Sequence, residues 1–444
     1  MAKKTEKIQP VATQQPEQVV TFTDAQGSAN VQLGKYNYTV KVECKSPEKV
    51  EVTLFNDGSV KVKFPADVGK KNSKVSVVDS NGNEVENVIV KEDILEVRNL
   101  KKYFPLSKTL LGKTLTSLKA VDDVSFKLEE GTTIGVVGES GCGKTTLGRT
   151  ILKLYESDGG SIYFMGDDIT HLKRKQMLKY RTDIQLIFQD PYSSLPPRMT
   201  VGNIIAEAVR VHHIVPKDQV KDYVHDIMKQ CGLPRHFYDR FPHEFSGGQR
   251  QRICIARALA VKPRLVICDE PVSALDVSIQ AQIINLLKKL QKTKGFSYVF
   301  ISHDLSVVKY ITDKIMVMYL GNVMETGETD EIFDNPLHPY TKALFSAVPV
   351  PDPDVKMERI ILGGDIPSPA NPPKGCKFHT RCSQCMDVCK FKTPQYIEHS
   401  KNHFVACHLY DNEVMSNLDK YNKEYKEMLL EEEQKALRNE KKQG

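Results

Sequence analysis

The segment that most constrains this chain is Gly138-Glu-Ser-Gly-Cys-Gly-Lys-Thr-Thr146, which directly follows an apolar run at 133–137. It matches the pattern G-x-x-x-x-G-K-[ST], in which a buried strand leads into a glycine-rich loop and then into a helix. The strand is expected at 133–137, and Leu147 and Ile151 have helical spacing after the loop. The glycines let backbone N–H groups point at phosphate oxygens, and the helix N-terminus adds positive potential. The sequence therefore predicts an α/β fold that binds a nucleotide.

Individual residues of this loop have expected roles. Lys144 would reach the β- and γ-phosphates, and the Thr145 hydroxyl would ligate Mg²⁺. The alternative interpretation is a glycine-rich turn before an ordinary helix, which the flanking strand and helix patterns disfavour. The expected nucleotide contacts of the loop are Gly138, Ser140, Gly141, Gly143, Lys144, Thr145 and Thr146.

Composition sets the broad class of the chain. Its 444 residues allow an ample core and roughly two to three domains. A net charge of +6 is mild for this length and does not by itself indicate nucleic-acid binding. The sequence contains no run of about 18 apolar residues and no signal-peptide pattern. We therefore expect a soluble, cytoplasmic chain whose membrane role depends on partners.

The first ninety residues have two different compositions. Residues 1–30 are rich in Gln, Lys, Thr and Pro, which predicts a disordered polar tail. Residues 31–90 alternate apolar and polar side chains around Asn56-Asp57-Gly58 and around Asn81-Gly82, which predicts two hairpins. We therefore expect a small β module of unknown role at 31–90.

Two carboxylates end another apolar strand, at Leu265-Val-Ile-Cys-Asp-Glu270. Delivered beside the phosphate loop, Asp269 would hold Mg²⁺, and Glu270 would polarise a water that attacks the γ-phosphate. Gln189 and His303 follow two further β-like runs. The Gln189 amide can touch Mg²⁺ and the attacking water, and a neutral His303 can donate to the γ-phosphate. Each is more often structural when it stands alone, but the combination with the phosphate loop favours the catalytic interpretation.

A second anion-binding helix start is expected at Phe245-Ser-Gly-Gly-Gln249. Ser246 would cap the helix, and its N–H group and those of Gly247 and Gly248 would face an anion. One chain does not need two such sites for one γ-phosphate, so this site is expected to face the nucleotide of another chain. The expected contacts are Ser246, Gly247, Gly248 and Gln249.

Two further nucleotide contacts are expected outside both helix starts. Asp276 lies shortly after Glu270 in the chain. Phe104, or with less support Tyr103, follows the first strand of this region and could stack on adenine, as aromatic faces do.

Together these residues resemble the ATP-binding cassette (ABC) ATPases. The segment 138–146 is similar to Walker A, Gln189 to the Q-loop glutamine, 245–249 to the signature motif (Phe replacing the usual Leu), 265–269 to Walker B, Glu270 to the catalytic glutamate, Asp276 to the D-loop aspartate and His303 to the switch histidine. The resemblance implies a P-loop (RecA-like) ABC domain at 92–348 with a helical subdomain at about 199–245. It also implies a head-to-tail dimer in which ATP lies between Lys144 of one subunit and 246–248 of the other. ATP would close this dimer and hydrolysis would open it.

Three further segments resemble the ATPase subunits of peptide importers, and most closely the second, F-type, subunits of oligopeptide and dipeptide permeases. They are 189–200, 335–341 and 364–379, with Pro196 where this family usually has Asn. The resemblance implies a partner ATPase subunit in a heterodimer, two transmembrane permease subunits and an external peptide-binding protein, with no nucleic acid. It implies a place at the cytoplasmic face of the membrane and a peptide-importer C-terminal region at 349–410. A charged helical tail is expected at 411–444.

Four of the ten cysteines, Cys376, Cys382, Cys389 and Cys407, are spaced C-x5-C-x6-C-x17-C, with Cys385 between them. Four thiols so close together in a cytosolic chain favour a metal over disulfides. The spacing lacks the tight pairs of zinc sites and suits an iron–sulfur cluster at least as well. The peptide-importer C-terminal region is associated with a four-iron cluster, so the resemblance implies a structural [4Fe-4S] cluster. Zinc and free thiols remain the alternatives.

Other functions compete with a peptide-import motor. A soluble ABC ATPase acting on DNA or ribosomes is disfavoured, because no long insertion separates Lys144 from Ser246 and the chain carries one cassette. A non-hydrolysing regulatory cassette is disfavoured because Glu270 and His303 are both present. Substrate is the least constrained point, since relatives carry nickel, glutathione or sugars and specificity lies in other subunits.

Overall fold

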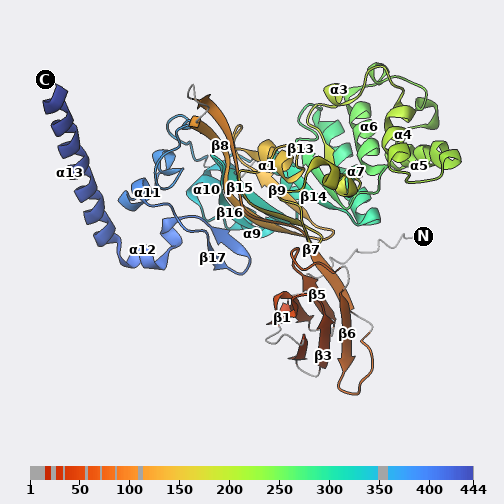
Figure 1. Cartoon of the computed structure of the whole chain (residues 1–444), viewed down its shortest axis with the longest axis horizontal. Coiled ribbons are helices and arrows are strands. Elements are labelled where there is room, and N and C mark those ends of the chain that lie inside the picture. Colours follow the sequence, from red (N-terminus) through yellow and green to blue (C-terminus); the bar gives the residue numbers. More distant parts are fainter. Residues whose placement is uncertain are drawn as a thin grey trace, which may run out of the picture. The chain divides into compact units, whose positions relative to one another are not determined.

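The computed structural model describes residues 16–21, 27–33, 36–55, 59–70, 73–85, 88–108, 114–348 and 359–443. The chain divides into two compact units, residues 1–96 with 163–169 and residues 97–162 with 170–444; Figure 1 labels many elements of each. Several predicted features lie outside the described residues: 1–15 and 22–26 of the polar tail, the turn at 56–58, and 349–358 at the start of the C-terminal region.

The smaller unit contains two small sheets. The first orders β1 (Pro16–Thr21), β4 (Glu51–Phe55), β5 (Val60–Phe64) and the start of β7 (Val88–Lys108), with β5 and β7 parallel and the other pairs antiparallel. The second orders β2 (Ser28–Leu33), β3 (Tyr36–Glu43) and β6 (Lys74–Asp79), all antiparallel. Residues 167–168 form the short β11, which pairs with the end of β10 (Gly159–Phe164).

The first predicted hairpin is confirmed by the pairing of β4 with β5. Val52 lies opposite Val62, and Leu54 lies opposite Val60. All four side chains are buried, because alternate residues of a strand point to the same face and the apolar face turns inward. At the second predicted hairpin the Val85 N–H donates to the Val77 carbonyl, and β6 pairs further with β3.

The predicted disordered tail needs correction where the structure describes it. Strand β1 and the start of β2 lie within residues 1–30. The backbone of β1 pairs along β4, and that of β2 along β3, so both strands satisfy their hydrogen bonds with partners distant in sequence. The polar composition of this segment does not reveal such partners, which is why composition alone favoured disorder.

The larger unit is organised around an eight-stranded sheet. Its order is β12 (Ile184–Ile187), β13 (Leu265–Asp269), β14 (Ser297–Ile301), β9 (Thr133–Val137), β15 (Lys314–Tyr319), β16 (Asn322–Glu328), β18 (His403–Val405) and β17 (Ile397–Ser400). The first five strands are parallel and the last three pair antiparallel. The later part of β7 pairs with β8 (Thr114–Glu129) and with β10.

Helices cover both faces of the parallel strands. Helix α1 (Lys144–Ile151) lies against Ile267 and Ile301, while α8 (Leu305–Ile311) lies against Gly135. In the strand register Gly135 pairs with Phe300, the neighbour of Ile301, so α1 and α8 lie on opposite faces. Continuous apolar strands such as β9 and β13 are buried throughout, as expected for a parallel sheet between two helical layers.

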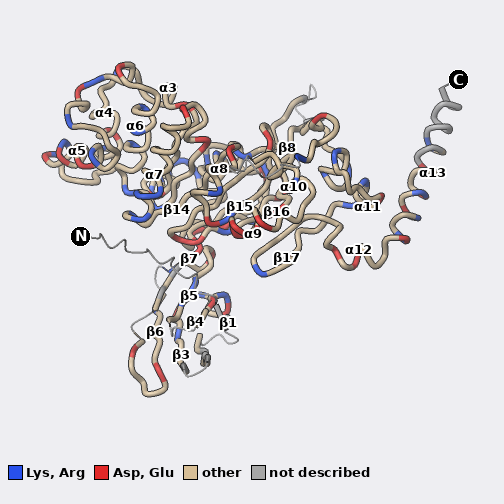
Figure 2. Tube along the Cα trace, turned by 180° about the vertical axis from the view of Figure 1, so that it is seen from behind, with Lys and Arg blue, Asp and Glu red and all other residues tan. Residues whose placement is uncertain are grey.

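The remaining helices form two groups, one on the side of β13 and β14 and the other on the side of β16 and β18 (Figure 1). One group holds α3 (Pro191–Ser194), α4 (Val201–Val211), α5 (Val220–Gln230), α6 (Gly247–Leu259) and α7 (Val277–Lys294). The other holds α9 (Thr329–Asp334), α10 (Pro339–Phe345), α11 (Asp387–Phe391), α12 (Asn412–Ser416) and α13 (Leu418–Gln443). A short α2 (Arg174–Met177) precedes β12. Acidic and basic residues alternate along the first turns of α13 (Figure 2).

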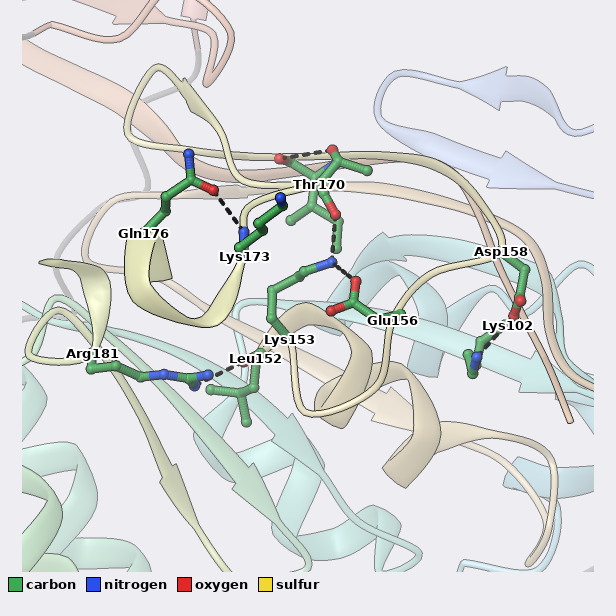
Figure 3. A network of polar contacts seen from close by, with 10 residues as sticks. Lys102, Leu152, Lys153, Glu156, Asp158, Thr170, Lys173, Gln176 and Arg181 are labelled. Atoms are coloured by element: carbon green, nitrogen blue, oxygen red, sulfur yellow. Dashed lines mark hydrogen bonds and ion pairs between the residues drawn. The ribbon is translucent and has the colours of Figure 1, made fainter. Parts of the chain in front are cut away.

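The end of α1 is held by cations, as Figure 3 shows. The Lys153 ammonium donates to the Thr170 carbonyl at 2.5 Å and pairs with the Glu156 carboxylate at 2.6 Å. The Arg181 guanidinium donates to the Leu152 carbonyl at 2.9 Å. The Arg181 charge beside the Leu152 carbonyl is favourable, because the last carbonyls of a helix carry its negative end. These contacts fix the helix that follows the phosphate loop.

Packing against α1 gives a stability prediction. Leu147 is completely buried, whereas Leu154, just beyond the helix, is 50% exposed. Leu147→Ala should lower the free energy of unfolding by about 2–5 kcal/mol, because it removes buried apolar surface and leaves a cavity. The matched change Leu154→Ala should cost less than about 1 kcal/mol. Urea unfolding followed by circular dichroism compares the two, and equal losses would contradict this account of the packing.

Candidate functional site

The phosphate loop at 138–143 joins β9 to α1. Gly143 occupies the N-cap position of α1 with φ of 106°, and a β-carbon there would lie 1.9 Å from the Ala120 carbonyl oxygen. Only glycine fits this position, because other residues avoid this φ and the neighbouring backbone leaves no space. Lys144 is buried, and its ammonium donates to the carbonyls of Gly138 at 2.7 Å and Glu139 at 3.0 Å. Ser140 and Gly141 are exposed at the tip of the loop.

Thr145 and Asp269 meet at the start of α1. The Thr145 hydroxyl donates to one carboxylate oxygen of Asp269 at 2.7 Å, and Arg149 lies 3.8 Å from the other. Burial raises the pKa of the Asp269 carboxyl, while the Thr145 hydroxyl, Arg149 and Lys144 act against that shift. The hydroxyl and carboxylate oxygens together form the kind of oxygen donor set that Mg²⁺ prefers.

Glu270 follows β13 in a left-handed backbone conformation, with φ of 47°. Its N–H donates to the Ile301 carbonyl at 3.0 Å, which ties it to the end of β14. The Gln189 amide donates to one carboxylate oxygen of Glu270 at 2.7 Å, and the His303 Nδ1 lies 3.4 Å from the other. The structure therefore brings three side chains together that the sequence distributes over more than a hundred positions.

Residues 246–249 begin helix α6. The Ser246 hydroxyl accepts from the Gln249 N–H at 3.4 Å, and the Gln249 side chain accepts from the Ser246 N–H at 3.1 Å, which is a reciprocal capping box. Gly248 lies against Ile279 of α7, where a β-carbon would come within 2.4 Å of the Ile279 side chain. None of the hydrogen bonds of the described residues joins 246–249 to the phosphate loop. Asp276 is exposed at the N-cap of α7.

The two aromatic candidates for adenine stacking differ in their contacts. Phe104 is half-buried on β7 and lies edge-on to Tyr155, with ring centroids 5.3 Å apart. The Tyr103 hydroxyl instead donates to Asp122 at 2.5 Å. Burial, and then this hydrogen bond, raises the pKa of Tyr103. The hydroxyl group of Tyr103 is thus engaged within the fold, which leaves Phe104 as the better candidate.

The C-terminal cysteines lie near one another, but the described residues contain no arrangement of them that would hold a metal ion. Burial, together with neighbouring thiols that include Cys382, raises the pKa of Cys376 and Cys407 to about 12 and that of Cys389 to about 11. All ten cysteines of the chain are free thiols. Within the described residues, no group of three or more His, Cys, Asp or Glu side chains is arranged to hold a metal ion. The structure therefore gives no support to the predicted iron–sulfur cluster, or to zinc, at these thiols.

Sequence reasoning missed three residues that contact the site. Arg149 lies one helical turn after Thr145, so helical spacing alone could have revealed it. Tyr340 and Arg381 contact Glu139 of the phosphate loop across 201 and 242 positions of sequence. No local pattern marks contacts over such distances.

Among the described residues, no helix is long and apolar enough to cross a membrane.

Comparison with known proteins covers most of the chain. Residues 121–273 match the family described as ABC transporter, and residues 324–389 match the family described as oligopeptide/dipeptide transporter, C-terminal region. The oligopeptide transport ATP-binding protein AppF of Bacillus subtilis is 53% identical over 322 residues, which are 72% of this chain and 98% of that protein.

Oligopeptide transport ATP-binding proteins from other bacteria are similar to this chain to the same degree. The oligopeptide transport ATP-binding protein OppF of Haemophilus influenzae is 52% identical over 71% of this chain and 97% of its own length. OppF of Escherichia coli is 50% identical over 71% of this chain and 95% of its own length. Identity of this extent, across nearly the whole of each relative, establishes common descent and a common fold. The chain belongs to the ABC ATPase family, in the branch of the oligopeptide transport ATP-binding proteins.

Proposed function

We propose that this chain is the ATP-hydrolysing subunit that powers import of oligopeptides or dipeptides through an ABC transporter. The main support for ATP hydrolysis is the position of the Glu270 carboxylate. One of its oxygens accepts a hydrogen bond from the Gln189 amide at 2.7 Å, and the other lies 3.4 Å from His303 Nδ1. Glu270 stands directly after Asp269, which is hydrogen-bonded to the phosphate-loop helix. The oligopeptide transport proteins that are 50–53% identical to this chain over 319–322 aligned residues support peptides as the transported substrate.

The phosphate loop binds ATP in this proposal. Backbone N–H groups of 140–146 face the phosphates, and Lys144 shifts its ammonium from the loop carbonyls toward the β- and γ-phosphate oxygens. Thr145, Asp269 and Gln189 would hold Mg²⁺, which when bound neutralises charge on those phosphates. Phe104 stacks on the adenine.

Glu270 acts as general base toward the water that attacks the γ-phosphate. Its carboxylate accepts the proton of that water as the new oxygen–phosphorus bond forms and the bond to ADP breaks. The Gln189 amide fixes one carboxylate oxygen and so orients the other. His303 is 60% exposed, so its ring is free to turn toward the γ-phosphate and donate to it. The left-handed backbone at Glu270 is strain of the kind that the surrounding strands maintain at functional sites.

A second chain completes the site. Ser246, Gly247 and Gly248 present the N-terminal N–H groups of α6, together with Gln249, but not to the phosphate loop of their own chain. In the proposed head-to-tail dimer they, and Asp276, contact the ATP held by the partner ATPase subunit. Closure on ATP and opening after hydrolysis then drive two permease subunits, which receive peptide from an external binding protein.

The proposal assigns parts of the chain to these tasks. The ATPase comprises 92–348 with its helical subdomain at about 199–245, followed by the C-terminal region 349–410 and the charged tail 411–444. The chain acts at the cytoplasmic face of the membrane through its permease partners. No role is assigned to the β module at 31–90.

The loop geometry predicts the effect of one methyl group. Gly143→Ala should abolish measurable ATP binding, because the new β-carbon would overlap the Ala120 carbonyl and force the loop to move. Gly295, at the end of α7, has a similar positive φ but no atom within 4 Å of a β-carbon. Gly295→Ala should therefore cost about 1 kcal/mol of stability and leave ATP binding intact. Calorimetric ATP titration of both variants decides; normal binding by Gly143→Ala would contradict the assignment of this loop.

Glu270→Gln should reduce ATP hydrolysis by on the order of 10²-fold or more while ATP still binds, because the amide cannot accept the proton. The control is Glu427→Gln on α13, where the side chain is 64% exposed and should not affect turnover. Phosphate release and nucleotide binding are measured on the same preparations. Near wild-type hydrolysis by Glu270→Gln would remove Glu270 from the catalytic role.

Uptake in cells tests the cargo. Cells lacking their own copy are given the wild-type chain or the Glu270→Gln variant, and entry of a labelled short peptide is measured. Uptake that depends on Glu270 supports peptide import. Peptide uptake that is equal in both strains contradicts it, and the same cells are then given labelled nickel, glutathione and sugars.

We also propose that Cys376, Cys382, Cys389 and Cys407 take up a [4Fe-4S] cluster, with zinc as the alternative. What supports it is four thiols gathered within one short region; their described arrangement would have to change on loading. Protein prepared without oxygen should contain about four iron ions per chain and absorb visible light. Cys382→Ser should lose the iron, whereas Cys44→Ser, in the smaller unit, should keep it. Zinc or no metal in the wild type would contradict the cluster.

A further inference from the structure

Glu139, the second residue of the phosphate loop, has a partner at each of its polar groups. Its N–H donates to the Tyr340 hydroxyl at 2.9 Å, and its carbonyl accepts from the Lys144 ammonium at 3.0 Å. Its carboxylate accepts two hydrogen bonds from the Arg381 guanidinium, at 2.7 and 3.2 Å. The residue therefore connects the phosphate-binding lysine to Tyr340 of α10 and to Arg381 of the C-terminal region.

An aromatic cluster holds Arg381 in place. Phe378, three residues earlier, packs edge-on against Tyr319 with centroids 5.3 Å apart and also contacts Tyr340 at 5.3 Å. All three rings are almost completely buried. The Arg381 guanidinium lies 6.0 Å from the Tyr319 ring and 3.5 Å from its hydroxyl. These buried rings, of which Tyr319 ends β15, thus fix the segment that carries Arg381 to the core of the ATPase.

Stability does not explain this ion pair. The Arg381 side chain is 8% exposed and that of Glu139 is 24% exposed, so both charges have lost much of their hydration. The Arg381 Nε is buried without a hydrogen-bond partner among the described residues. Replacing such a pair by apolar side chains is often neutral or favourable, because desolvation offsets the attraction of the two charges. Net stability is therefore a weak reason for this ion pair, and a role in nucleotide binding is a stronger one.

That reason lies in the charge of the ligand. A carboxylate on the loop that wraps a triphosphate repels it, and Coulomb interactions in a partly buried site extend over several ångströms. Bidentate pairing with a guanidinium cancels the negative charge and holds the carboxylate in one orientation. Arg381 supplies this pairing from the segment between Cys376 and Cys382.

We propose that Arg381 is a positioning residue of the ATP site, which neutralises Glu139 and thereby keeps the phosphate loop receptive to the triphosphate. The inference rests on the proposed ATP binding by this loop. Its rival is that Arg381 only fastens the C-terminal region to the rest of the unit. The two roles predict different results. If Arg381 only fastens the C-terminal region, losing its contact with Glu139 matters. If Arg381 neutralises Glu139, only an unpaired negative charge on Glu139 matters.

The test uses the full-length chain and the variants Arg381→Gln, Glu139→Gln and the double variant. Arg381→Gln should raise the Kd and KM for ATP about three- to tenfold and leave kcat within about twofold. The double variant should recover ATP affinity to within about twofold of wild type, because no uncompensated carboxylate remains. The loss in Arg381→Gln should shrink as salt is raised from 50 to 500 mM, since the partly exposed carboxylate is screened.

The matched control is Arg235→Gln, which removes an exposed arginine paired with Asp222 at 3.4 Å in the helical subdomain. It should leave the ATP Kd unchanged. The Glu139→Gln variant keeps the test decisive if Arg381→Gln does not fold, because the charge role requires that it bind ATP at least as tightly as wild type.

Each of the following results overturns the inference: unchanged ATP affinity in Arg381→Gln, weakened ATP affinity in Glu139→Gln, or no recovery in the double variant. Loss of affinity that is independent of salt would likewise assign Arg381 to the fastening role. Failure of the wild-type chain to bind ATP would instead overturn the proposed function, so the two failures are distinguishable.

Discussion

The parallel pairing of β13, β14 and β9 is the constraint on which the site depends. Parallel strands point the same way, so the loops that leave their carboxyl ends share one edge of the sheet. The phosphate loop leaves β9, the carboxylates Asp269 and Glu270 end β13, and His303 follows β14. A shift of one residue in any of these strands would turn its polar end to the opposite face. Burial of their apolar side chains fixes the register of the strands, and the register fixes the positions of the polar residues at their ends.

Polar side chains at this edge of the sheet form hydrogen bonds with one another. Asp269 is buried and is kept in place by the Thr145 hydroxyl, and Glu270 is held between Gln189 and the end of β14. Each contact joins a different segment of the chain, so the arrangement is rigid only when the whole sheet is formed. In the proposed function, carboxylates positioned in advance would lower the reorganisation that phosphoryl transfer requires.

The C-terminal region is part of the ATPase core rather than an appendage to it. Strand β18 extends the central sheet by pairing with β16, where the buried Glu325 accepts hydrogen bonds from the backbone of Leu337 and His338 and lies 2.7 Å from His403. The same region reaches the phosphate loop through Arg381, and Tyr340 of α10 contacts the same loop residue. Packed residues therefore join the phosphate loop to the segment that carries Cys376 and Cys382.

The sequence by itself determined the nucleotide-binding loop, the strand ends that carry Asp269, Glu270 and His303, and the hairpin of β4 and β5. These features are local, since each depends on the spacing of residues within one strand, loop or helix. Other features depended on tertiary structure: the strand β1 within a stretch expected to be disordered, the Glu139–Arg381 pair, and the arrangement of the C-terminal thiols. In the first two of these features, the interacting segments lie far apart in the sequence. The residue pattern of one segment does not specify the distance or orientation of the segment that it contacts. Packing of the complete fold decides such contacts, because only there do the two surfaces meet.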